Sequence, residues 1–80
     1  MFYVYILQSE RAPEQFYTGL ADDLRLRLTQ HNAGKSKHTA KYCPWVLINY
    51  TAFRDREKAV AFERYLKSGS GRAFANKRLI

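Results

Sequence analysis

The residues in this sequence that could do chemistry are a carboxylate inside an apolar helix face, an arginine–histidine pair and two tyrosines. Glu63 lies four residues after Ala59 and three before Leu66, inside the stripe predicted to face the core. Burying an ionised carboxylate without a partner is costly, so Glu63 would need a tyrosine hydroxyl, an arginine or a metal ion. The alternative is a place at the edge of the stripe, from which the carboxylate reaches water.

The arginine and the histidine, Arg27 and His31, are one helical turn apart and share a face at the border of core and solvent. A histidine at such a border is more often a structural hydrogen-bonding group, and Arg27 alone would be a surface cation. Tyr5 and Tyr17 lie on two predicted neighbouring strands, where cross-strand ring packing explains them equally well. Only the combination with Glu63 favours a catalytic interpretation.

A short basic stretch adds cations and hydroxyls of the kind that contact phosphates. It contains Lys35, Ser36, Lys37, His38, Thr39 and Lys41. A solvated loop would have the same composition, so this stretch indicates a substrate-binding role only weakly.

The charge distribution favours a polyanionic partner. The net charge is +7, from 14 Lys and Arg against 7 Asp and Glu, and no carboxylate occurs between residues 24 and 54 or after Glu63. Uncompensated positive charge of this kind suits nucleic acid, with a scattered basic surface as the alternative. Without a predicted signal peptide or membrane-spanning run, we expect a cytoplasmic protein that does not bind membranes.

The elements that must position these residues can be read from local patterns. Strands are predicted for Phe2–Ser9, Phe16–Leu20 and Trp45–Phe53, because these runs are rich in β-branched and aromatic residues. The second strand is expected to end at Gly19, where the chain must turn. The first and second strands are close enough to form a hairpin.

Two helices are predicted from capping residues and apolar spacing. Asp22 or Asp23 would cap a helix to about Asn32, and Asp55 would cap another to about Lys67. Residues 35–44 are predicted to be a loop, and residues 68–71 a break before a basic tail whose helicity stays open. The order ββαβα predicts one α+β domain over residues 1–80, a small three-stranded antiparallel sheet flanked by helices.

Four segments together resemble the GIY-YIG nuclease family, in particular its short members related to the nuclease module of a bacterial excision-repair subunit. "YVY" (Tyr3–Tyr5) stands where the family has its first motif, and "YTG" (Tyr17–Gly19) where it has its second. "DLRLRLTQHNAG" (Asp23–Gly34) matches the following helix. "AVAFERYLKSGSG" (Ala59–Gly71) matches the segment with the family's metal-binding glutamate.

This resemblance implies a role for each candidate residue. Glu63 would be the single protein ligand of Mg²⁺ or Mn²⁺, with waters and phosphate oxygens completing the shell. Tyr17, with Tyr5 beside it, would orient or deprotonate the attacking water, provided that neighbouring cations lower the tyrosine pKa. Arg27 would offset charge on the scissile phosphate, and His31 would position a tyrosine or relay a proton.

Four further positions bear on the resemblance. The backbone at Gly19 would lie close beneath the phosphate, because glycine has no side chain to hold it away. The first motif has Tyr3 in place of its glycine, and the second has Thr18 in place of isoleucine. Asn76 lies where the family often has an asparagine, but the surrounding residues give no firm alignment.

The resemblance therefore implies a divalent-metal-dependent endonuclease that hydrolyses phosphodiester bonds in DNA, with structure-dependent or weak specificity. The sequence favours DNA over RNA without deciding between them. The sequence leaves open a homodimer or a recruiting protein partner. The alternative is a non-catalytic nucleic-acid-binding domain on the same scaffold, although binding alone does not need a carboxylate facing phosphates. A protein-interaction adaptor would leave the charge pattern unexplained.

Overall fold

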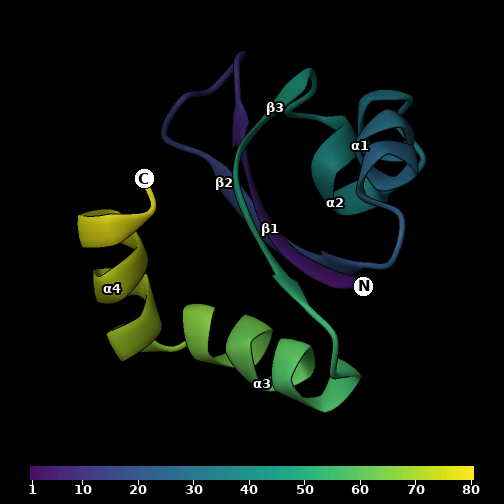
Figure 1. Cartoon of the computed structure of the whole chain (residues 1–80). Helices are drawn as coiled ribbons and strands as arrows, with labels where there is room; N and C mark the ends of the chain where they lie inside the picture. Colours follow the sequence, from purple (N-terminus) through teal and green to yellow (C-terminus); the bar gives the residue numbers. More distant parts are fainter.

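The computed structural model describes residues 1–80 and consists of a three-stranded antiparallel sheet with helices on both faces (Figure 1). The elements follow one another along the chain as β1 (Phe2–Ser9), β2 (Phe16–Ala21), α1 (Leu24–Asn32), α2 (Lys37–Ala40), β3 (Trp45–Phe53), α3 (Arg56–Leu66) and α4 (Gly69–Arg78). The strand order in the sheet is β2-β1-β3. The predicted α+β class and antiparallel sheet are confirmed.

The central strand β1 is buried from both sides. Val4 to Leu7 are each at most 2% exposed. Because successive side chains of a strand point to opposite faces, Val4 and Ile6 pack in one core cluster with residues of α3 and α4. Tyr5 and Leu7 pack in a second cluster with leucines of α1. One strand therefore contributes to two cores, one under each pair of helices.

The register of the hairpin places the candidate tyrosines on one face of the sheet. Tyr5 pairs with Gly19, and Leu7 pairs with Tyr17. Since paired residues share a face, Tyr5, Leu7, Tyr17 and Gly19 all lie on the side of α1. The strand sequences alone do not determine this register.

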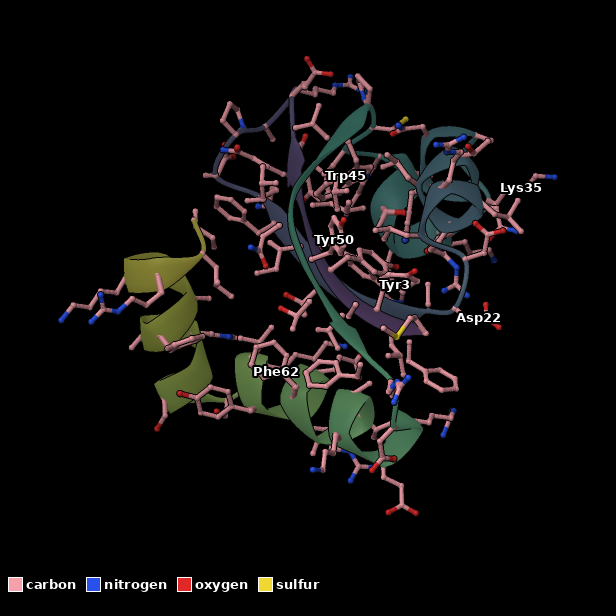
Figure 2. All side chains as sticks on the ribbon, viewed as in Figure 1. Tyr3, Asp22, Lys35, Trp45, Tyr50 and Phe62 are labelled. Atoms are coloured by element: carbon pink, nitrogen blue, oxygen red, sulfur yellow. The ribbon has the colours of Figure 1, made fainter.

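Other aromatic side chains pack against one another in pairs that do not include His31. Tyr3 meets Tyr50 edge to face, with ring centroids 5.8 Å apart, and Tyr42 meets Trp45 in the same way at 6.3 Å. Figure 2 shows Tyr3 and Tyr50 together on the sheet, and Phe62 between α3 and the strands. Phe62, Tyr42 and Trp45 enlarge the two cores, whereas Tyr50 is 53% exposed and packs with Tyr3 outside both clusters.

The helices α1 and α3 begin at the predicted caps. Asp23 Oδ1 accepts a hydrogen bond from the Leu26 amide at 3.0 Å, and Asp55 Oδ1 accepts one from the Glu57 amide at 2.9 Å. In both cases the aspartate satisfies an amide that has no partner within the helix. No helix has the length and apolar character needed to span a bilayer.

Two boundaries predicted from the sequence, one in β2 and one around α2, are wrong. The strand β2 does not end at Gly19 but continues to Ala21, because Tyr3 to Tyr5 on β1 pair with its last residues. The predicted loop of residues 35–44 contains the short helix α2, whose buried residue is Thr39. That burial, which a polar sequence does not reveal, holds the turn in helical form.

The predicted break after the second helix is confirmed, since α3 ends at Leu66, but it is shorter than residues 68–71 because α4 already begins at Gly69. Ser68 Oγ accepts a hydrogen bond from the Gly71 amide at 3.1 Å and so acts as the N-cap. A Cβ atom at Gly71 would overlap the backbone carbonyl of Tyr65, so glycine lets α4 start directly against the end of α3. The tail whose helicity the sequence left open is helical to Arg78.

Candidate active site

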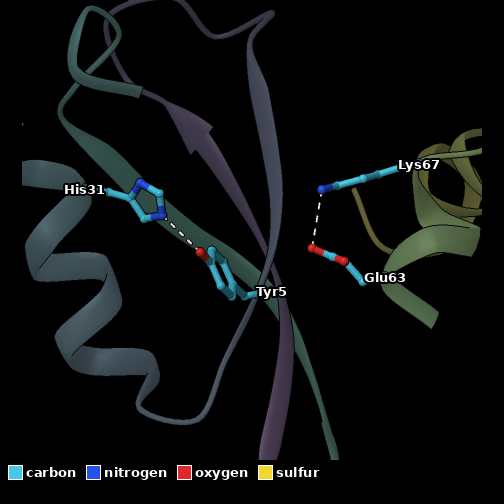
Figure 3. A network of polar contacts seen from close by, with 4 residues as sticks. All are labelled: Tyr5, His31, Glu63 and Lys67. Atoms are coloured by element: carbon cyan, nitrogen blue, oxygen red, sulfur yellow. Dashed lines mark hydrogen bonds and ion pairs between the residues drawn. The ribbon is translucent and has the colours of Figure 1, made fainter. Parts of the chain in front are cut away.

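The centre of the candidate site is a chain of hydrogen bonds from β1 through α1 to α2. Tyr5 Oη lies 2.9 Å from His31 Nε2 (Figure 3), and His31 Nδ1 lies 2.8 Å from Thr39 Oγ1. All three residues are buried, each at most 3% exposed. Both ring nitrogens of His31 therefore have protein partners, which fixes the orientation of the imidazole.

The environment keeps His31 neutral and makes Tyr5 a weaker acid. Burial, followed by the charge of Arg27, lowers the pKa of His31 below its ordinary value of 6.5. Burial is also the largest cause that raises the pKa of Tyr5 to about 12. Tyr17 adds to that increase, the nearby Arg27 guanidinium opposes it, and Glu63 contributes a smaller increase. At neutral pH one nitrogen of His31 donates a hydrogen bond and the other accepts one.

Gly19 is required by the phenol ring of Tyr5. A Cβ atom at Gly19 would overlap the hydroxyl and the ring of Tyr5, and it would lie 2.9 Å from Cε2 of Tyr17. The missing side chain therefore lets Tyr5 cross the neighbouring strand and reach His31. Tyr5 fills the space on that side of the strand, and the expected place of Gly19 beneath a phosphate stays a prediction.

Tyr17 completes the aromatic group around the histidine and stays accessible to solvent. Its ring centroid lies 4.8 Å from that of His31 and 6.2 Å from that of Tyr5. It is only half-buried, whereas Tyr5 is 1% exposed. Of the two tyrosines, Tyr17 is thus the one that a bound substrate or water can reach.

A small pocket opens beside Tyr17, and we call it the Tyr17 pocket. It has a volume of about 160 Å³ and is lined by Tyr17, Arg27, Gln30, His31, Lys35 and Ser36. Arg27 and Lys35 are exposed, and Figure 2 shows Lys35 extending outward from the end of α1. Two cations and no carboxylate at the mouth make this pocket suited to an anionic group such as a phosphate.

Glu63 approaches the group from the opposite face of the sheet. Its carboxylate Oε2 lies 3.3 Å from Lys67 Nζ, one turn further along α3, and its side chain is 20% exposed. Figure 3 shows Tyr5 and His31 on one side of the strands and the Glu63–Lys67 pair on the other. Glu63 does not line the Tyr17 pocket, yet its charge is near enough to contribute to the raised pKa of Tyr5.

Both expectations for Glu63 hold in part. The carboxylate has a partner, but this is Lys67 rather than the tyrosine, arginine or metal ion considered from sequence. It also reaches water at the edge of the stripe. The pairing was open to prediction, because a glutamate four residues before a lysine is a common helix pair.

The remaining predicted residues lie further out. Lys37 and His38 belong to α2, are exposed and do not line the Tyr17 pocket. Asn76 on α4 is exposed and lines a separate groove. The sequence reasoning placed Thr39 among surface hydroxyls, whereas the structure buries it against His31. No local pattern marks Thr39 out, because its burial depends on where α2 packs.

The chain belongs to the GIY-YIG family, as the sequence motifs predict. A family model described as the GIY-YIG catalytic domain matches residues 1–78. The arrangement described above therefore occupies a nuclease-type fold. The two motif departures, Tyr3 and Thr18, lie within strands that pair in full register.

The relatives are called UPF0213 proteins. One from Lacticaseibacillus paracasei is 39% identical over 67 residues, which are 82% of this chain and 73% of the relative. One from Streptococcus pyogenes serotype M5 is 39% identical over 89% of this chain and 76% of its own. A solution NMR structure of a UPF0213 protein from Bacillus halodurans matches with a TM-score of 0.57 and 30% identity, covering 99% of this chain and 87% of that chain. These names state no reaction.

Proposed function

We propose that this protein is a divalent-metal-dependent endonuclease that hydrolyses phosphodiester bonds in DNA, with structure-dependent or weak sequence preference. The observation that carries the proposal is the convergence of Tyr5, Tyr17, Arg27 and His31 on one face, beside a cationic pocket. Membership of the GIY-YIG family supports a nuclease-type reaction. The net charge of +7 supports an anionic polymer as substrate.

Tyr17 and Arg27 would act directly on the substrate. Both line the pocket and both are accessible, so a phosphate in the pocket would meet the guanidinium and the phenol together. Arg27 would offset the negative charge that develops on the phosphate during attack by water. Tyr17 would orient that water by hydrogen bonding, since its ring lies against the fixed imidazole of His31.

Tyr5 and His31 would position Tyr17 rather than supply a strong base. A Tyr5 pKa of about 12 keeps this phenol protonated at neutral pH. Tyr5 therefore lacks the lowered pKa that a tyrosine base needs. The neutral His31 ring, bonded at both nitrogens, holds the two tyrosine rings in place. This assigns Tyr5 a positioning role in the proposed reaction.

The residues fit a hard divalent ion bound through one protein ligand. No group of three or more His, Cys, Asp or Glu side chains gathers in the structure, so a cage built from protein ligands alone is absent. Glu63 offers a partly exposed carboxylate whose only ion-pair partner is a flexible lysine. Mg²⁺ and Mn²⁺ accept such a site because they keep several waters and share phosphate oxygens. When bound, the ion would neutralise phosphate charge and stabilise the leaving oxygen.

The test is nicking of branched, single-stranded and duplex DNA with Mg²⁺ or Mn²⁺. We expect cleavage by the wild type, none with EDTA and none by Glu63→Ala, which should still bind DNA. Glu57→Ala is the matched control, because Glu57 is exposed on the first turn of the same helix. Binding without cleavage under every metal would instead favour the non-catalytic nucleic-acid-binding domain.

A further inference from the structure

A second, larger hollow runs between β2 and α4, and we call it the β2–α4 groove. Its volume is about 580 Å³, within the range of about 300–1,000 Å³ that holds small organic ligands. Residues 14–18, before and within β2, form one wall, and the end of α3 with α4 forms the other. The proposed hydrolysis uses none of this volume.

The two walls differ in chemistry. The β2 wall carries Phe16, which is 39% exposed, next to Glu14 and Gln15. The helix wall carries Lys67 and Arg72, both exposed cations. An aromatic surface with hydrogen-bonding side chains suits a nucleobase, and a pair of cations suits phosphates. The carboxylate of Glu14 would repel a phosphate from the β2 wall, so a phosphate is expected at the helix wall and a base at the β2 wall.

The groove borders the candidate active site at two residues. Tyr17 lines both the β2–α4 groove and the Tyr17 pocket. Lys67 lines the groove and pairs with Glu63 at 3.3 Å. That pair is weak because the Lys67 side chain is 52% exposed, so an incoming phosphate can draw the lysine away from Glu63.

We propose that the β2–α4 groove seats an unpaired nucleotide adjacent to the scissile phosphate, with its base on Phe16 and its phosphates on Lys67 and Arg72. This inference rests on the proposed nuclease function and names its substrate class as DNA with a single-stranded segment at the cut. The bases of an intact duplex have both faces stacked on neighbours, so only an unpaired base can present a face to Phe16. The groove thereby favours single strands and unpaired tails over blunt duplex.

The experiment measures binding, separately from cleavage. Glu63→Gln protein in EDTA is titrated into fluorescein-labelled oligonucleotides: a single strand, a duplex with an unpaired tail and a blunt duplex. Adding Phe16→Ala is expected to weaken binding of the single strand and the tailed duplex about tenfold, with less than about a twofold change for blunt duplex. Arg72→Ala should also weaken the first two ligands more than the third.

Matched controls come from α4. Phe74 is 37% exposed, an exposed fraction similar to the 39% of Phe16, and Arg78 is exposed like Arg72. Neither Phe74 nor Arg78 lines the groove. Phe74→Ala and Arg78→Ala should therefore leave the ratio between single-strand and duplex affinities unchanged. Phe16→Trp, which keeps a ring, should restore binding, and DNA should quench its fluorescence, whereas Trp45 is only 3% exposed.

Each outcome decides the proposal. Equal losses on all three ligands, or a loss with Phe74→Ala as large as with Phe16→Ala, would overturn it. The same holds if Phe16→Trp binds no better than Phe16→Ala. A wild type that never cleaves would remove the nuclease function without touching these affinity ratios. If the wild type cleaves DNA but Phe16→Ala leaves the ratio between single-strand and duplex affinities unchanged, the groove proposal is refuted and the nuclease function stands.

Discussion

Thr39 is expected to be essential for holding His31, although it touches neither the Tyr17 pocket nor the groove. Thr39→Val keeps the β-branched shape and removes only the hydroxyl that lies 2.8 Å from His31 Nδ1. No buried side-chain nitrogen or oxygen lacks a partner in the wild type, so this change creates the first one. An unsatisfied buried group costs about 1–3 kcal/mol, which corresponds to a fall in Tm of roughly 5 to 20 °C in a domain of this size.

The assay combines thermal unfolding with ¹⁵N NMR of the histidine rings. Thr39→Val should shift the tautomer balance of His31, while the exposed His38 serves as an internal reference. Thr39→Ser is the control, because it keeps the hydroxyl and should keep the wild-type tautomer even where loss of the methyl group lowers stability. A Thr39→Val protein with wild-type Tm and unchanged His31 ring signals would refute this account of the network.

Three further predictions concern stability and binding. Gly71→Ala should cost about 1–3 kcal/mol of unfolding free energy, because its Cβ meets the end of α3, whereas Gly69→Ala meets open space and should cost nothing measurable. Because the pKa of His31 is lowered in the fold, its contribution to stability is complete above pH 6.5 and is lost as the pH falls through the folded pKa. Denaturation at several pH values should show this loss of unfolding free energy at acid pH, and the loss should be smaller in His31→Gln. Replacing Lys35 and Lys37 together with alanine should reduce the salt slope of DNA binding by roughly 1.5 to 2, and an unchanged slope would remove both from the footprint.

Much of the scaffold could be predicted because its signals are local. The run of β-branched and aromatic residues in Phe2–Ser9 and the capping aspartates Asp23 and Asp55 determine nearby backbone directly. The strand patterns also place Tyr5 and Tyr17 on neighbouring strands, which the structure confirms. The boundary errors at Gly19 and after Ser68 share a cause. Glycine and serine are typical of breaks, but here Gly19 makes room for Tyr5, Gly71 makes room for the end of α3, and Ser68 caps α4.

The unpredicted parts of the site depend on contacts between distant segments. Thr39 meets His31 only because α2 packs beside α1, and Gly19 serves Tyr5 only through the hairpin register. The position of Glu63 on the opposite face from the Tyr17 pocket likewise follows from where α3 crosses the sheet. Sequence spacing fixes which residues share a helix face, but it does not fix which strand edge that face meets.

The way α4 is attached has a consequence for hydrogen exchange. The helix packs mainly against α3. It meets the core through a few side chains such as Ala75 and Leu79 and lies outside the hydrogen-bonded sheet. Its amides should therefore exchange through a local opening that leaves β1 folded, at a lower free energy than global unfolding. Such an opening would carry Arg72 away from Phe16, so a ligand that bridges the two should slow exchange in α4 more than elsewhere.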